Sequence, residues 1–141
     1  MTTPSTKITI ETTVAATMAD VWRAWNTPQD IKQWNAASPD WHTTAAAVDL
    51  RVGGKFSSRM EAKDGSMGFD FTGVYTKIDA HKLIEYTMSN GRRVHNEFMA
   101  DNDRVTLRVI FDAESENPIE MQRQGWQAIL DSFAKHVAAV R

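Results

Sequence analysis

The sequence contains no cysteine among its 141 residues. Disulfide bonds, thiolate nucleophiles and cysteine-ligated metals are therefore excluded, and a fold without disulfides suits a reducing compartment. Charge of one sign is also scarce, because 16 basic and 18 acidic residues leave a formal net charge of -2. A nucleic-acid surface needs a basic stripe to engage phosphates, so we expect no nucleic-acid partner.

Long apolar runs are missing as well. No run approaches the roughly 20 residues needed to cross a bilayer, so we expect no membrane insertion. Residues 1–7 lack the long apolar core of a signal peptide. Together these features predict a cytoplasmic protein. The length suits a single domain over residues 1–141, of which we expect residues 1–6 to be flexible.

Periodicity in the first part of the chain predicts one strand and two short helices. Residues 7–14 alternate apolar and polar side chains, which is typical of a half-buried strand. Thr17 and Asp20 have the spacing of a helix-start box, and an apolar stripe follows over residues 18–25. Pro28 suits the first turn of a second helix.

The middle of the chain predicts six strands. Asp-Gly at 64–65 and Asn-Gly at 90–91 are strong hairpin signals, because these residue types tolerate positive φ. Short connections favour antiparallel pairing, since a parallel crossover needs about a dozen residues or more. Gly53-Gly54 is interpreted as a tight connection rather than a phosphate-binding loop, because no Gly-x-Gly-x-x-Gly pattern and no helix accompany it. The predicted strands cover residues 41–52, 54–62, 67–78, 82–89, 93–100 and 104–113.

After Pro118 the period changes to that of a helix that runs almost to Arg141. A helix of about 22 residues is about 33 Å long, enough to cross a small sheet. Gly125 is expected to let this helix approach the sheet closely. The apolar stripe recurs at steps of four and three and consists of Trp126, Leu130, Phe133, Val137 and Val140.

The order of these elements is βααββββββα. It predicts an α+β fold in which a curved antiparallel sheet of about seven strands carries two short helices and a long C-terminal helix on one face.

Five separated motifs occur in this order: VWRAW at 21–25, TP at 27–28 with Ile31 and Trp34, DLRVGGKF at 49–56, FTGVY at 71–75 and GWQAIL at 125–130. With them, the chain resembles the START-like or polyketide-cyclase (SRPBCC) superfamily, whose architecture is called the helix-grip fold. Within it, the chain is similar to the branch named after the activator of the 90-kDa heat-shock-protein ATPase.

The resemblance implies a cavity between the long helix and the inner face of the sheet. Relatives bind lipids, sterols or hormones, and some cyclise polyketides or hydrolyse small substrates. Members that activate the heat-shock ATPase carry a separate N-terminal domain that this activity needs. We expect no room for such a domain in 141 residues.

Inward-facing positions are expected to give this cavity an apolar wall with a few polar groups, the arrangement by which ligand sites fix orientation. Flexible Met side chains suit an adaptable wall. The alternative is a solid core whose hydroxyls are satisfied by backbone or water. The predicted ligand-binding residues are Ser58, Met60, Phe69, Phe71, Tyr75, Tyr86, Met88, Asn96, Trp126 and Leu130.

No catalytic residue, metal ligand or cofactor is predicted. His95 and Glu97 share one strand face and are interpreted as exposed or as a surface ion pair. A catalytic dyad there would need that face to line the cavity. The serines lack the Gly-x-Ser-x-Gly setting of a nucleophile. The histidines are scattered without the spacing of a metal site: His42, His81, His95 and His136.

The leading hypothesis is a domain that binds an apolar small molecule, lipid-like or aromatic, in the cavity. One alternative is a cyclase- or hydrolase-like enzyme, which predicts a strongly perturbed titratable group inside the cavity. Another is a chaperone-associated or self-association module, which requires a large apolar outer patch. A homodimer is left open, and the sequence does not specify the ligand.

Overall fold

The computed structural model describes residues 6–140. The predicted order βααββββββα is confirmed over this range. The expected flexibility of residues 1–6 falls, except for Thr6, outside the described residues. The elements are β1 (Lys7–Val14), α1 (Met18–Asn26), α2 (Pro28–Trp34), β2 (Trp41–Val48), β3 (Lys55–Ala62), β4 (Gly68–Asp79), β5 (Leu83–Met88), β6 (Arg93–Asp101), β7 (Arg104–Asp112) and α3 (Ile119–Val140).

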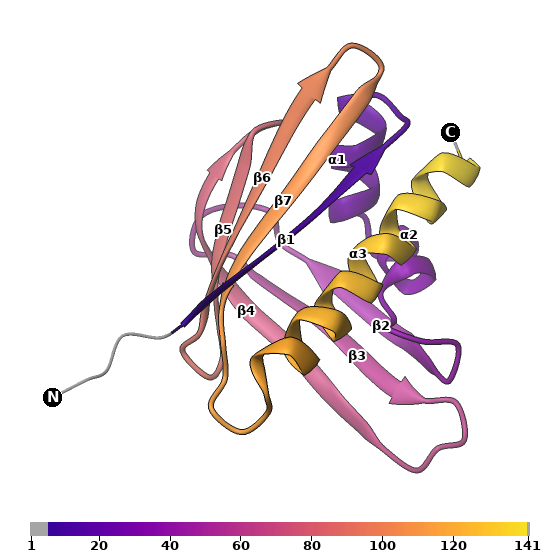
Figure 1. Cartoon of the computed structure of the whole chain (residues 1–141), viewed down its shortest axis with the longest axis vertical. Helices are drawn as coiled ribbons and strands as arrows, with labels where there is room; N and C mark the ends of the chain where they lie inside the picture. Colours follow the sequence, from indigo (N-terminus) through magenta and orange to yellow (C-terminus); the bar gives the residue numbers. More distant parts are fainter. Residues whose placement is uncertain (1–5, 141) are drawn as a thin grey trace, which may run out of the picture.

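The strands form one antiparallel sheet in the order β1-β7-β6-β5-β4-β3-β2. The first strand therefore lies beside the last, with Lys7 opposite Asp112 and Val14 opposite Val105. Figure 1 shows the sheet curving around α3, with α1 and α2 beside the C-terminal half of that helix. All three helices thus lie on one face of the sheet, as predicted.

The second strand is shorter than predicted, because it ends at Val48 rather than at residue 52. Residues 49–54 instead reverse the chain. The N–H of Gly54 donates to the carbonyl of Arg51 at 2.8 Å, and Gly53 has a φ of 86°. A Cβ on Gly54 would overlap the carbonyl oxygen of Asp49. The tight connection predicted at Gly53-Gly54 is confirmed. The turn begins before Gly53, and β2 therefore ends earlier than predicted.

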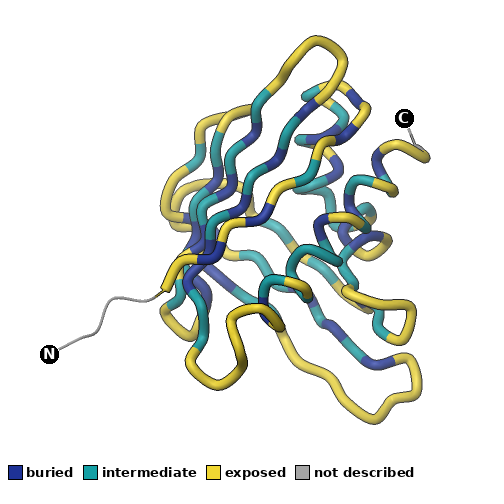
Figure 2. Tube along the Cα trace, viewed as in Figure 1, coloured by how far each residue is buried: buried dark blue, intermediate teal, exposed yellow. Residues whose placement is uncertain are grey.

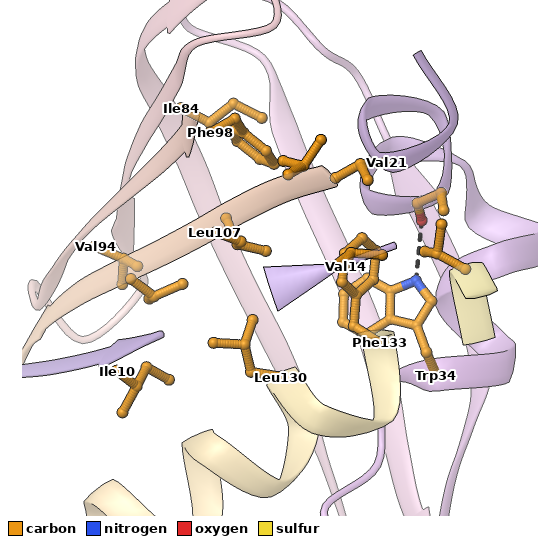
Figure 3. Close-up of a cluster of buried hydrophobic side chains, with 14 of the residues drawn as sticks. Ile10, Val14, Val21, Trp34, Ile84, Val94, Phe98, Leu107, Leu130 and Phe133 are labelled. Atoms are coloured by element: carbon orange, nitrogen blue, oxygen red, sulfur yellow. Dashed lines mark hydrogen bonds between the residues drawn. The ribbon is translucent and has the colours of Figure 1, made fainter. Parts of the chain in front are cut away.

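Local signals set the start of the first two helices. Thr17 caps α1, since its hydroxyl accepts a hydrogen bond from the N–H of Asp20 at 3.2 Å. Pro28 occupies the first turn of α2, where its missing N–H costs nothing. The indole N–H of Trp34 then donates to the carbonyl of Ala24 at 2.9 Å and ties the two helices together (Figure 3).

The core lies between α3 and the inner face of the sheet. Figure 2 shows buried positions alternating with intermediate or exposed ones along the strands, as their sequence pattern predicts. Leu130, Phe133 and Val137 of the predicted α3 stripe are buried, and Leu130 and Phe133 point toward the strands in Figure 3. The side chain of Val140 lies outside the described part of the chain.

The expectation that Gly125 allows a close approach to the sheet is wrong. A Cβ built on Gly125 would meet nothing within 4 Å. This face of α3 is open at Gly125, because Trp126 and Leu130 are the residues that turn toward the sheet. None of the helices within residues 6–140 is both long enough and apolar enough to span a bilayer.

Candidate functional site

A cavity of about 380 Å³ lies between the N-terminal half of α3 and the inner face of the sheet. This volume falls within the range of about 300–1,000 Å³ that is usual for ligand pockets. Most of the wall is apolar. The lining residues are Ile10, Trp25, Trp34, Asn35, Met60, Phe69, Asp70, Phe71, Thr72, Tyr86, Met88, Ser89, Asn90, Arg92, Asn96, Val109, Trp126, Ile129 and Leu130.

The structure brings most of the predicted site residues together in this one cavity, namely Met60, Phe69, Phe71, Tyr86, Met88, Asn96, Trp126 and Leu130. Ser58 and Tyr75 do not line it. They line an adjoining space of about 70 Å³, which shares Phe71 and Tyr86 with the main cavity. Their strand positions were predicted on the inner face, but they lie beside this adjoining space and not beside the main cavity.

Phe69 differs from the other lining residues because 47% of its surface is exposed. It follows Gly68 at the start of β4, opposite Met60 on β3. Alternation correctly places Phe69 on the inner face, yet β4 extends past the part of the sheet that the helices cover (Figure 1). Phe69 therefore lies at the mouth of the cavity rather than within it.

Aromatic rings build one wall of the cavity. Trp126 of α3 stacks on Phe111 of β7, with ring centroids 3.8 Å apart and planes 8° from parallel. Phe71 meets Trp126 edge-on at 6.2 Å and Tyr86 edge-on at 6.4 Å. Such offset and edge-on contacts are favourable beyond the area that they bury. They hold the helix and three strands at a fixed separation around the cavity.

Asn96 is a polar residue at the base of this apolar wall. It is fully buried, and its amide nitrogen donates to the carbonyl of Ile84 at 3.0 Å. Its Oδ1 has no hydrogen-bond partner among the described residues. An unpaired buried acceptor costs about 1–3 kcal/mol. This acceptor has almost no accessible surface, so a donor from a bound molecule reaches it only when the side chains in front of it shift.

Arg92 is a lining residue that the sequence reasoning missed. One of its terminal nitrogens, Nη1, donates to the backbone carbonyl of Asp112 at 3.3 Å. Its Nε is buried and has no partner among the described residues. Extending the alternation of Val94, Asn96 and Phe98 back by one step would have placed Arg92 on the inner face. The predicted strand began at residue 93, so this position was not considered.

Tyr86 and Tyr75 carry the two phenols of this region. Burial, with a smaller contribution from Tyr75, raises the pKa of Tyr86 well above its usual range, and the charge of Arg92 only partly opposes this. Burial and the charge of Asp49 raise the pKa of Tyr75 to about 12. The enzyme alternative required a perturbed group in the cavity, and Tyr86 is one. A phenol that holds its proton so firmly can donate a hydrogen bond but supplies no base at neutral pH.

His95 and Glu97 lie on the outer face of the sheet, away from this cavity. The Nε2 of His95 is 3.2 Å from a carboxylate oxygen of Glu97, and its Nδ1 is 2.6 Å from one of Glu85. All three side chains are about one-third exposed. The predicted surface pairing is confirmed. Within residues 6–140 no group of three or more His, Asp or Glu side chains could hold a metal ion.

Comparisons with known proteins match the chain over nearly its whole length. The profile of the family described as "Activator of Hsp90 ATPase homolog 1-like protein" matches residues 15–138. An AHSA1-like protein from Aeromonas hydrophila is 46% identical, with a TM-score of 0.89 over 95% of this chain and 93% of that chain. Chr148 from Cytophaga hutchinsonii is 50% identical, with a TM-score of 0.81 over 92% and 90%.

More distant structures share the fold alone. Protein CV1439 from Chromobacterium violaceum is 20% identical, with a TM-score of 0.84 over 94% of this chain and 98% of that chain. No curated protein matches the chain.

Proposed function

The chain belongs to the Activator of Hsp90 ATPase homolog 1-like family, and within that family we propose that it binds an apolar or aromatic small molecule between α3 and the sheet. The observation that carries the proposal is the largely apolar cavity of about 380 Å³ with an unpaired acceptor, Asn96 Oδ1, in its wall. Ligand sites combine these two properties, because apolar area supplies affinity and sparse polar groups fix orientation.

The size of the cavity supports occupation by a molecule. The cavity opens to solvent where Phe69 is exposed, so water fills it when no ligand is bound. Releasing water from an apolar wall favours the ligand.

Titration with N-phenyl-1-naphthylamine, an uncharged apolar fluorophore, tests the proposal. Its fluorescence is followed together with that of tryptophan, because Trp25, Trp34 and Trp126 all line the cavity. We expect saturable binding with a stoichiometry of one. Absence of saturable binding up to the solubility limit of the fluorophore would overturn the proposal.

A matched pair of variants locates the binding. Met88→Trp places a larger side chain in the cavity wall, whereas Met67→Trp makes the same change at a side chain that is 65% exposed and does not line the cavity. We expect Met88→Trp to weaken binding at least about tenfold, since the added ring occupies the space that the fluorophore needs. Met67→Trp should bind like the wild type. Equal affinities in the two variants would place the fluorophore elsewhere.

A further inference from the structure

Three polar side chains follow one another along the inner face of β5 and β6. Arg92 precedes β6 by one residue and shares the inward parity of Asn96. Tyr86 of β5 lies opposite Val94, midway between them. Four residues of strand span about 13 Å, so Arg92 and Asn96 mark two ends of an elongated polar row. All three residues line the same cavity.

Arg92 carries a positive charge that no described carboxylate neutralises. The carboxylate of Asp112 is engaged by Lys7 and Arg93, and only its backbone carbonyl contacts Arg92. Asp70, the acidic residue in the lining, is exposed and pairs with Arg59 at 3.6 Å. Arg92 lines the cavity, and a guanidinium is suited to an oxyanion because its planar donors match a carboxylate.

Asn96, at the other end of the row, needs a hydrogen-bond donor from the ligand, whereas Arg92 needs an acceptor. One N–H of the Asn96 amide is used by the carbonyl of Ile84, whereas its acceptor Oδ1 has no partner among the described residues. A ligand that meets it with a hydroxyl or N–H group removes the cost of the unpaired oxygen. A ligand with only apolar atoms there leaves that cost in place.

We propose that the ligand is an amphipathic carboxylic acid with an apolar ring or chain as its body, whose carboxylate pairs with Arg92 and whose opposite end donates a hydroxyl or N–H hydrogen bond to Asn96. This inference rests on the proposed function and adds the chemical class of the ligand. The aromatic rings of Phe71, Tyr86 and Trp126 line the same cavity and suit a planar body.

Three naphthalene probes test the two ends separately by isothermal titration calorimetry. The acid arm compares 2-naphthoic acid with its uncharged amide, 2-naphthamide. We expect the wild type to bind the acid at least about tenfold more tightly, the gain expected of one charge-assisted pair. Arg92→Gln should abolish this preference and leave the affinity for the amide within about twofold.

Arg104→Gln is the control, because it makes the same change in net charge at an exposed arginine that does not line the cavity. It should keep the preference of the wild type for the acid. Arg92→Lys retains the charge without the planar fork and should keep part of the preference. Melting curves confirm that each variant is folded.

The hydroxyl arm compares 6-hydroxy-2-naphthoic acid with 2-naphthoic acid. We expect the hydroxyl to improve affinity about threefold or more in the wild type and in Arg92→Gln, and to bring no gain in Asn96→Leu. Loss of the acid preference in Arg104→Gln as well as in Arg92→Gln, or no acid preference in the wild type, overturns the anion assignment. If N-phenyl-1-naphthylamine binds in that case, the proposed function stands without it. If no probe binds, both proposals fail.

Discussion

The indole of Trp126 lies parallel to the ring of Phe111, with 3.8 Å between their centroids. The stack joins α3 to β7, and Phe111 is in turn paired with Ile8 of β1 and Val94 of β6. This aromatic contact thus helps to position the long helix over three adjacent strands. Trp126 also forms part of the cavity wall.

Replacing Trp126 by Leu should lower the free energy of unfolding by about 1–3 kcal/mol, since it removes the stack and leaves a gap. Urea unfolding followed by circular dichroism measures the change. Trp41→Leu is the control, because Trp41 makes only a tilted contact with Phe69 at 5.8 Å and does not line the cavity. A loss at Trp41 as large as at Trp126 would contradict the role assigned to the stack.

Two glycine-to-alanine changes should shift stability in opposite directions. A Cβ on Gly73 would lie 2.6 Å from a ring carbon of Phe56 and 2.9 Å from the carbonyl oxygen of Thr87. Gly73→Ala should therefore destabilise the protein by about 1–3 kcal/mol. Gly125→Ala meets no neighbour within 4 Å and should stabilise α3 by about 0.5–1 kcal/mol. Thermal and urea unfolding measure both, and a destabilised Gly125→Ala would show that the helix needs this glycine.

Asn96→Leu should change the free energy of unfolding by less than about 1 kcal/mol, because the gain from removing the unpaired Oδ1 offsets the loss of the hydrogen bond to the carbonyl of Ile84. Asn96→Asp introduces a side chain of similar size that carries a buried negative charge. It should instead destabilise the protein by more than about 2 kcal/mol at pH 7. Urea unfolding compares the two variants. If Asn96→Leu costs as much as Asn96→Asp, the residue serves the fold rather than a ligand.

The contribution of Asp112 to the free energy of unfolding should change with pH in the acid range. Burial opposes its ionisation, but hydrogen bonds from Lys7 and from the N–H of Arg93, with the charges of both residues, outweigh burial and lower its pKa below 3.8. A carboxyl with a depressed folded-state pKa stabilises the fold above its unfolded pKa and loses that contribution as pH falls through the folded value. Asp112→Asn should therefore be less stable than the wild type at pH 7, and the difference should shrink below pH 3.8. A difference that does not change with pH would contradict the assignment.

The contribution of Tyr75 to the free energy of unfolding should change with pH in the alkaline range. Its pKa rises from 10.0 to about 12 in the fold, so the neutral phenol stabilises the folded state fully below pH 10. This contribution is lost as pH rises from 10 through about 12. Tyr75→Phe should flatten the fall in stability over that range, as measured by urea unfolding at fixed pH. Phenolate absorbance at 295 nm gives the titration directly, and an ordinary titration near pH 10 would contradict the burial.

Much of the fold follows from local pattern. Alternation over residues 7–14 and the Thr17 cap give β1 and the start of α1, because both depend on neighbours a few residues away. The end of β2 was missed because the turn over residues 49–54 is held by contacts with β4, where the N–H of Gly53 donates to the carbonyl of Tyr75. A connection stabilised from a distant strand leaves no periodic signal.

The site was predicted less completely than the fold. Parity assigns a side chain to a face of the sheet, and it found Met88 and Asn96 in this way. It does not say how far the helices extend over that face, so it could not separate Tyr75 from the main cavity or place Phe69 at its mouth. Arg92 was missed because it lies one residue before the predicted strand, and the alternation of inward and outward side chains was not extended to it.

The pairing of β1 with β7 also orders events during synthesis. β1 leaves the ribosome first, yet its sheet partner is complete only once the chain has been made as far as Asp112. Domains assemble when such distant partners become available, and contacts of high sequence separation form slowly. Ile10, which lines the cavity from β1, therefore joins its wall late. The nascent chain therefore passes through a stage in which β2 to β6 can pair while β1 still has no partner in the sheet.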